Sequence, residues 1–492
     1  MQQQSLKKVT ISGLFWSFSG LIANQGVQFV IQIALARLLT PVDFGIIGMT
    51  TVFIALAQSF ADCGFANALI REKDTSQEDY STVFYFSFAV SLFLYLILFF
   101  SSNAISVFFR EPQLTAVIRV IAIILIINSF SIIQITIMNK NLQFKTVTKV
   151  LVISSLLSGI IAIIFAYYGF GVWSLVIRTV SMQVIQCILV FIYNFWLPSP
   201  VFRMNSFKRL YGFGWKLMAA GVIDTMYQNL YYLIIGKAFT ATELGYYSNA
   251  QKLRDIASSS ISNSVQKVSY PVLSRIKDER QRLRQGYRKV IRAVVFVTFP
   301  LMLGIAVAAE PIILTMFGRK WFSSISYFQI LCLAGMLFPL HALNLDILQV
   351  VGRSDLFLRL EVIKKVVGFT SISLVLFFNL GISGLLWAAV IVSYISYFIN
   401  SYYSAELISY SAAEQIKDIA PIFMCTVIMA AVVFLCGRII TAGNLVKLFV
   451  ETTVGVVSYL LACKILKLNE LKEIIEIIKV FANKLRRREH SE

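Results

Sequence analysis

The stretch RLLTPVDFG, residues 37–45, has a counterpart 200 residues later in KAFTATELG, residues 237–245. Both segments place a cation first, a threonine fourth, an acid seventh and a glycine last, and Gln28 falls on Gln228 at the same offset. Farther on, residues 169–171 parallel residues 381–383. This repeat predicts two halves built from the same series of elements, a common plan among transporters whose substrate path lies between the halves.

The composition indicates a membrane protein. Of the 492 residues, 58% are hydrophobic and only 14% are charged, whereas soluble domains are about a quarter charged. A bilayer core needs about 20 apolar residues per helical span, so the chain can hold roughly fourteen spans. The first apolar run, residues 11–36, is too long for a signal-peptide core and is interpreted as a retained span.

Apolar runs bounded by glycine, proline and charge clusters predict thirteen spans. They cover residues 11–36, 44–69, 80–102, 114–138, 150–168, 172–196, 212–236, 289–311, 324–350, 361–378, 384–404, 419–436 and 445–463. The stretch 246–269 is too polar to be identified by hydropathy, but the repeat aligns it with the second span. It is therefore predicted to be the eighth of fourteen.

The distribution of cations supports fourteen spans with both termini in the cytoplasm, because lysine and arginine accumulate in short cytoplasmic loops. In this topology the outer loops contain only Arg37, Arg110, Lys237, Arg319, Lys320 and Arg438. Without the polar span, the basic tail would be exported. We therefore expect four regions: six-helix bundles at 1–200 and 201–405, two additional spans at 406–466, and a basic amphipathic tail on the cytoplasmic leaflet at 467–492.

Polar side chains inside spans are costly and normally face a wet cavity or a partner. On the eighth span, polar residues recur at steps of three and four and therefore share one helical face. These residues are Ser248, Lys252, Asp255, Ser259, Ser262 and Gln266. The span is predicted to lie between lipid and a water-filled interior. The alternative is an amphipathic helix lying on the membrane surface.

Other spans carry candidates for a substrate path. Gln25, Gln28 and Gln32 form a stripe on the first span, with Gln228 at an equivalent position on the seventh. Amides suit a path for a glycan, although interhelical hydrogen bonding uses the same residues. Arg178 lies in an apolar run of the sixth span. It is a candidate for binding phosphate, and snorkelling toward the headgroups is the alternative.

The acids Asp62, Asp224 and Asp346 are candidates for coupling transport to H⁺ or Na⁺, and each could equally pair with a cation or cap a broken helix. The two histidines and six scattered cysteines show no metal or disulfide spacing, so no metal and no cofactor are expected.

The segment 36–49, ARLLTPVDFGIIGM, resembles the first-loop signature of Wzx-type polysaccharide flippases, and residues 62–65 and 68–71 continue it. Residues 243–250 and 270–275 resemble the matching segments of the second half. The resemblance weakens after about residue 405. It implies the all-α fold of the multidrug/oligosaccharidyl-lipid/polysaccharide exporters, which the MATE transporters share: two six-helix bundles around a central cavity, two additional spans, and alternating access.

In that family the usual substrate is a sugar chain on undecaprenyl diphosphate, and the cavity is cationic, consistent with Lys252, Arg254 and Arg178 here. The leading hypothesis is thus a flippase in the bacterial inner membrane, serving O-antigen, capsule or exopolysaccharide synthesis. Its expected partners are membrane lipids, a polysaccharide polymerase and glycosyltransferases, not nucleic acid.

Two alternatives remain. An ion-coupled multidrug or organic-cation antiporter of the same fold would need an acidic cavity, which the cations of the sixth and eighth spans disfavour. A glycan polymerase or ligase would need a sizeable outer loop with catalytic groups, and no paired-carboxylate or Ser/His spacing is present in the sequence.

Overall fold

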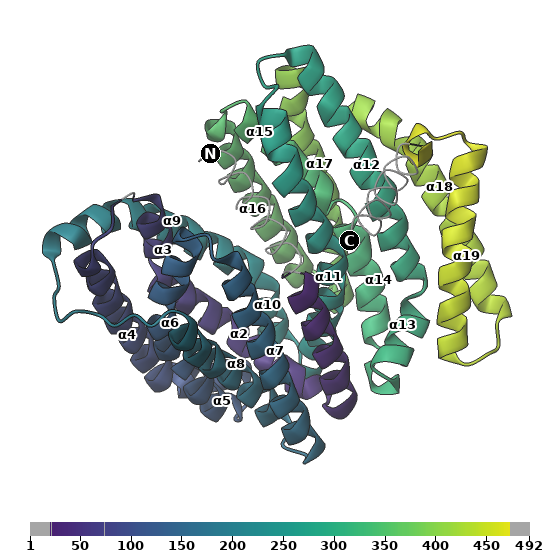
Figure 1. Ribbon diagram of the computed structural model, residues 1–492. Helices are drawn as coiled ribbons and strands as arrows, with labels where there is room; N and C mark the ends of the chain where they lie inside the picture. The colour runs from purple at the N-terminus through teal and green to yellow at the C-terminus, as the bar shows by residue number, and fades with distance from the viewer. Residues whose placement is uncertain (1–19, 21, 73, 473–492) are drawn as a thin grey trace, which may run out of the picture. The chain divides into compact units, whose positions relative to one another are not determined.

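A computed structural model describes residue 20, residues 22–72 and residues 74–472 (Figure 1). Its regular elements in these ranges are helices. Residues 22–38 form the first. The next ten are α2 (Pro41–Asp62), α3 (Phe65–Arg71), α4 (Gln77–Phe109), α5 (Leu114–Ile121), α6 (Ile123–Lys140), α7 (Phe144–Tyr167), α8 (Val172–Tyr193), α9 (Met204–Gln228), α10 (Leu230–Ala238) and α11 (Ala241–Ser274).

The second half of the chain continues in the same way. Its elements are α12 (Arg280–Val307), α13 (Ala309–Met316), the 3₁₀ turn η1 (Arg319–Trp321), α14 (Ser324–Gly335), α15 (Phe338–Val350), α16 (Ser354–Phe377), α17 (Gly381–Ile408), α18 (Ala412–Ile439) and α19 (Asn444–Ile465). The predicted tail begins at residue 467, and its residues 473–492 lie outside the described part of the chain, as do residues 1–19.

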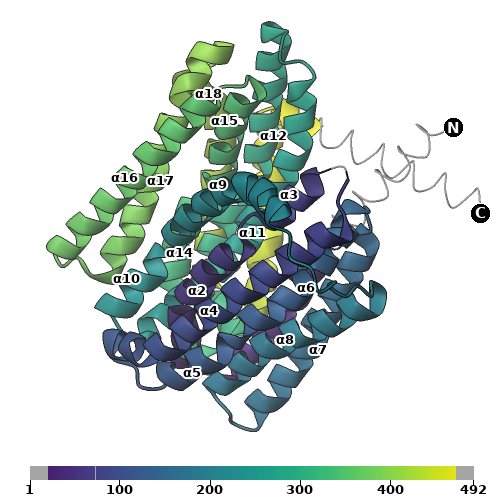
Figure 2. The same cartoon turned by 90° about the vertical axis from the view of Figure 1, so that its left-hand side faces the viewer.

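The chain packs as two compact units that divide between Ser248 and Asn249, inside α11. In the first unit, α7 packs along α8, and α4 packs against α5 and α6. In the second, α16 packs along α17 (Figure 2), and α18 packs against both α12 and α19 (Figure 1). These two packing units are defined by contacts and not by the sequence repeat. The division into repeat halves, with its boundaries at 200, 405 and 466, stays a prediction.

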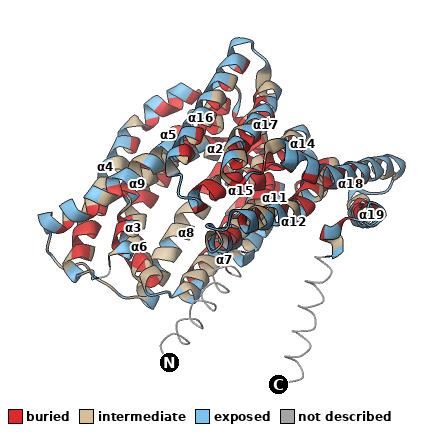
Figure 3. Ribbon diagram, turned by 90° about the horizontal axis from the view of Figure 1, so that it is seen from above, coloured by how far each residue is buried: buried red, intermediate tan, exposed pale blue. Residues whose placement is uncertain are grey.

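Within the described part of the chain, ten helical segments are long and apolar enough to cross a membrane. Large apolar side chains are exposed on their outer faces, for example Phe449 at 73% and Ile439 at 79% (Figure 3). Such surfaces are costly in water but match a bilayer interior. The other four predicted spans are also helical, as residues 22–38, α9 with α10, α11, and α16. The chain is therefore an all-α multi-pass membrane protein, and the count of fourteen spans stays a prediction.

Local sequence fixes where three of the long helices begin. Thr40 and Asp43 form a capping box at α2, in which each side chain accepts a hydrogen bond from the backbone of the other residue. Ser76 with Asp79 does the same at α4, and Ser411 with Glu414 at α18. These reciprocal bonds satisfy donors that the first turn of a helix leaves unpaired, and so define the helix start.

Several predicted spans are broken. The seventh is interrupted at Asn229, between α9 and α10, and the tenth between Gly335 and Phe338, where Pro339 follows in the first turn of α15. Breaks inside a membrane are tolerated where protein satisfies the freed backbone groups. At the tenth span, the Ser258 hydroxyl donates to the carbonyl oxygen of Gly335 at 2.9 Å.

Candidate functional site

A buried polar centre of the second unit is built around Asp346, near the end of α15. Its side chain is 5% exposed, and one carboxylate oxygen accepts a hydrogen bond from Nε2 of Gln266 at 3.1 Å. The other oxygen, Oδ2, has no hydrogen-bond partner among the described residues. Because a buried carboxylate in a span is costly, this position is a candidate for binding a proton or a small cation. The hydrogen bond joins Gln266 and Asp346, which the sequence analysis proposed as two separate candidates.

Two residues before Asp346, Asn344 belongs to a fully buried hydrogen-bond network that sequence reasoning missed. The hydroxyl of Tyr287 on α12 donates to Oδ1 of Asn344 at 2.9 Å. Gln415 on α18 exchanges bonds with Asn344, donates to Ser404 at 3.0 Å and accepts from Tyr397 at 3.2 Å. The network ties α12, α15, α17 and α18 together around Gln415, which is 0% exposed.

The polar face of α11 is less uniform than predicted. Lys252 is exposed and Asp255 half-buried, whereas Ser248 is buried at 3%. Arg254, proposed as a cavity cation, is 8% exposed, and its guanidinium pairs with Asp255 at 2.6 Å and lies 4.8 Å from the Phe338 ring. Its charge is therefore compensated within the second unit. The side chain of Ser259 lies outside those the structure describes.

In the first unit, the predicted polar positions fall into separate places. Asp224 and Gln228 are joined one turn apart on α9, with Nε2 of Gln228 donating at 2.6 Å, and both are exposed. Gln25 is exposed, Gln28 half-buried and Gln32 buried at 6%, so the stripe runs from the surface into the packed interior. Asp62 is exposed at the last residue of α2.

Arg178 lies in the second turn of α8, inside the predicted sixth span, and is half-buried. Its guanidinium has no hydrogen-bond or ion-pair partner among the described residues, whereas the Arg119 guanidinium donates to the Ser102 hydroxyl at 2.9 Å. An uncompensated arginine inside a span can bind an anionic group such as a phosphate.

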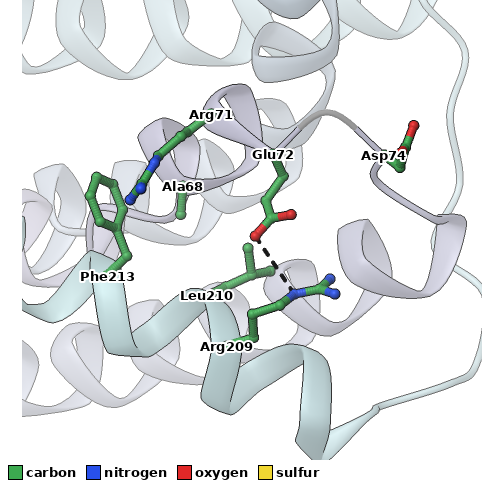
Figure 4. A pocket seen from close by; sticks show the side chains of 7 residues that line it. All are labelled: Ala68, Arg71, Glu72, Asp74, Arg209, Leu210 and Phe213. Atoms are coloured by element: carbon green, nitrogen blue, oxygen red, sulfur yellow. Dashed lines mark ion pairs between the residues drawn. The ribbon is translucent and has the colours of Figure 1, made fainter.

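A polar pocket of about 570 Å³ lies where α3 meets α9, on the side that the cation distribution assigns to the cytoplasm (Figure 4). The Arg71 guanidinium lies 4.5 Å from the centre of the Phe213 ring, and Nε of Arg209 approaches Glu72 at 3.7 Å. Arg209 also pairs with the buried Asp79 at 2.8 Å. Sequence reasoning missed this pocket, because its residues lie at helix ends that hydropathy treats as loops.

Comparison with known proteins gives the family. Residues 34–326 match the family described as polysaccharide biosynthesis protein. The chain is 25% identical to the teichuronic acid biosynthesis protein TuaB of Bacillus subtilis, over 87% of this chain and 89% of that protein.

Two solved structures share the fold. The lipid II flippase MurJ in an inward closed conformation matches with a TM-score of 0.76 at 15% identity, over 91% of this chain and 98% of that one. An inward-facing MATE transporter of the MOP superfamily matches with a TM-score of 0.61 at 16% identity, over 78% and 94%. The predicted MATE-like fold is thus confirmed, and because the family match covers more than half of its residues, the chain belongs to the polysaccharide biosynthesis protein family.

Proposed function

We propose that this protein is a flippase that moves a lipid-linked oligosaccharide across the bacterial inner membrane for surface polysaccharide synthesis. The observation that carries the proposal is the combination of a polysaccharide biosynthesis family with the fold of a lipid flippase. The protein is accordingly a transporter and not an enzyme. Its substrate carrier is undecaprenyl diphosphate, and its cargo is a glycan of the O-antigen, capsule, exopolysaccharide or teichuronic acid type.

The diphosphate needs fixed positive charge, because an anion that leaves water is stabilised only when it is paired and hydrogen-bonded. Arg178 fits this role best, since its charge is not compensated by another described residue. The exposed Lys252 is the second candidate. Arg254 is a weaker one, because it is already paired with Asp255. The amide side chains Gln25, Gln28 and Gln228 offer both donors and acceptors to sugar hydroxyl groups.

The driving ion is proposed to be H⁺ or Na⁺, bound at Asp346. Support comes from the burial of this carboxylate and from its oxygen Oδ2, which lacks a partner among the described residues. Asp62 and Asp224 are exposed and are secondary candidates. We further propose that both termini are cytoplasmic and that the protein works with glycosyltransferases and a polysaccharide polymerase.

The test uses a strain that lacks the gene, complemented with the wild type, Arg178→Ala, Lys252→Ala or the control Lys208→Ala, which removes an exposed cation near the start of α9. Surface polysaccharide and inner-face lipid-linked oligosaccharide are both measured, at matched protein levels. We expect Arg178→Ala to lose surface glycan while the precursor accumulates, and Lys208→Ala to export normally. Normal export in the strain without the gene would refute the flippase.

A further inference from the structure

A groove open to the bilayer runs between α17 and α18 in the second unit. A cavity of about 220 Å³ lies between these helices, α12 and the break between α14 and α15. A second cavity of about 660 Å³ adjoins it toward the end of α17 and the start of α18. Phe398 lines both cavities, so the two lie next to each other, and together they are called the groove.

The inner part of the groove suits a hydrocarbon chain. Its floor is fully apolar and buried, with Phe299 at 3% and Leu340 at 1% exposure. Its rims are apolar and exposed, with Phe398 at 52%, Ile416 at 45% and Phe423 at 41%. These helices are among the candidate membrane spans, so the medium beside the rims is lipid. A chain that fills the groove gains close packing that loosely ordered lipid does not give.

The outer part of the groove has a mixed apolar and polar lining, and charged groups of both signs lie in or near it. The exposed carboxylate of Glu406 lines it, together with Ser401, Tyr402 and Ser411. Lys417 is exposed on α18, one turn beyond Ala413, which lines the same cavity. The Arg280 guanidinium also reaches this end, where it donates to the carbonyl oxygen of Glu406 at 2.7 Å.

The neighbouring acids on α18 do not neutralise the positive charges of Lys417 and Arg280. Glu414 is paired with Arg284 at 2.9 Å, and Asp418 is paired with Arg288. Lys417, in contrast, has no hydrogen-bond or ion-pair partner among the described residues. The end of the groove therefore presents a carboxylate for a cation and a separate ammonium group for an anion.

We propose that this groove is a binding site for a phospholipid with a zwitterionic headgroup that carries a primary ammonium, such as phosphatidylethanolamine. One acyl chain fills the apolar part, the phosphate lies by Lys417, and the ammonium lies by Glu406. Anionic lipids such as phosphatidylglycerol lack the cation that Glu406 attracts. Choline lipids have the cation, but their quaternary nitrogen has no N–H to donate to the carboxylate.

The site borders the broken tenth span. Met336 and Leu337, the two residues between α14 and α15, line the floor of the groove. The Tyr397 side chain lines it as well and bonds to the buried Gln415. An occupying chain thus packs against the break in the span that carries Asp346. The bound lipid stabilises this region of the second unit.

The experiment measures lipid binding directly and does not depend on transport. The delipidated full chain is titrated in detergent with phosphatidylethanolamine, phosphatidylglycerol, phosphatidylcholine and undecaprenyl phosphate, and bound lipid is counted by native mass spectrometry. Ala420→Trp fills the groove. Its matched control is Ala431→Trp, at an exposed position farther along the same helix.

We expect phosphatidylethanolamine to bind most tightly, Ala420→Trp to weaken it at least about tenfold, and Ala431→Trp to leave it unchanged. Lys417→Gln should weaken it about fivefold, and Glu406→Gln should remove the preference over phosphatidylcholine. Equal binding by the two tryptophan variants would overturn the proposal, and so would an unchanged preference in Glu406→Gln. Tighter binding of undecaprenyl phosphate would assign the groove to the carrier tail instead.

Discussion

Gly45 and Gly245 occupy equivalent positions in the two copies of the repeat and make the same contact in opposite directions. A Cβ atom on Gly45 would lie 1.8 Å from the carbonyl oxygen of Ala241, and one on Gly245 would lie 1.8 Å from that of Pro41. Pro41 and Ala241 are themselves equivalent in the repeat. The first turns of α2 and α11 therefore touch backbone to backbone, in the manner of close helix pairs with small residues at the contact.

Replacing Gly45 with alanine should force these helices apart, because the atom that its Cβ meets is a backbone oxygen that cannot rotate away. We expect a loss of about 1–3 kcal/mol in stability, typical of overpacking, and a lower thermal midpoint of the purified protein in detergent. Gly48→Ala is the control, since its Cβ meets side-chain atoms of Leu244 at 3.2 Å. Equal midpoints for the two variants would show that the contact is not tight.

Gln415 should be important for stability, although it lies near the start of α18. Gln415→Leu leaves the buried Tyr397 hydroxyl, the Ser404 hydroxyl and Asn344 each without one partner. Hydrogen bonds in membrane proteins average below 1 kcal/mol, so losing several of them predicts about 2 kcal/mol of destabilisation. Gln349→Leu, at an exposed position on α15, is the control. A melting curve of Gln415→Leu that overlays the wild type would refute the role of the network.

These residues also show what the sequence could and could not predict. Hydropathy located the apolar middle of each span, and the repeat with its Thr40 and Thr240 segments indicated that the polar stretch after Gly245 is a helix equivalent to α2. The spans predicted from hydropathy are too short where the ends of a helix carry charged residues. Hydropathy placed Gln415 and Tyr287 in loops, whereas the helices continue through both, because capping and tertiary packing set helix ends.

The candidate site was only partly predictable, because one-dimensional spacing gives the face of a helix but not what lies opposite it. Gln266 and Asp346 were each identified as polar residues in a span, and their hydrogen bond depends on how α11 packs on α15. Arg254 was assigned to the cavity because the family resemblance implies a cationic one. Asp255, its immediate neighbour, pairs with it, which a pattern of residue types does not reveal.

If Asp346 binds the driving ion, Asp346→Asn should abolish transport without unfolding the protein, because asparagine keeps the shape and can still accept from Gln266. Asp355→Asn is the control, since Asp355 pairs with Arg353 at 2.9 Å at an exposed helix start. Surface glycan and thermal midpoint are measured for both. Wild-type export by Asp346→Asn would exclude Asp346 from coupling, and a collapsed midpoint would assign it a structural role.

Two arginines near the start of α9 in the first unit make a matched pair for the last prediction. Arg209 pairs with Asp79, which is 4% exposed, and approaches Glu72 across the pocket of Figure 4, whereas Arg203 pairs with the more exposed Glu78 at 2.6 Å. Removing a partner from a buried carboxylate costs more than breaking an exposed pair.

Arg209→Ala should therefore destabilise the protein by about 2 kcal/mol, and Arg203→Ala by less than about 0.5 kcal/mol. Asp79 retains its bonds to Ser76 in the capping box, so α4 should still begin at the same residue. Thermal midpoints at low and high salt check the prediction. The difference between the two variants should persist in high salt, because the Arg209 pair is partly shielded from solvent. Equal midpoints would mean that Asp79 is held by its helix cap alone.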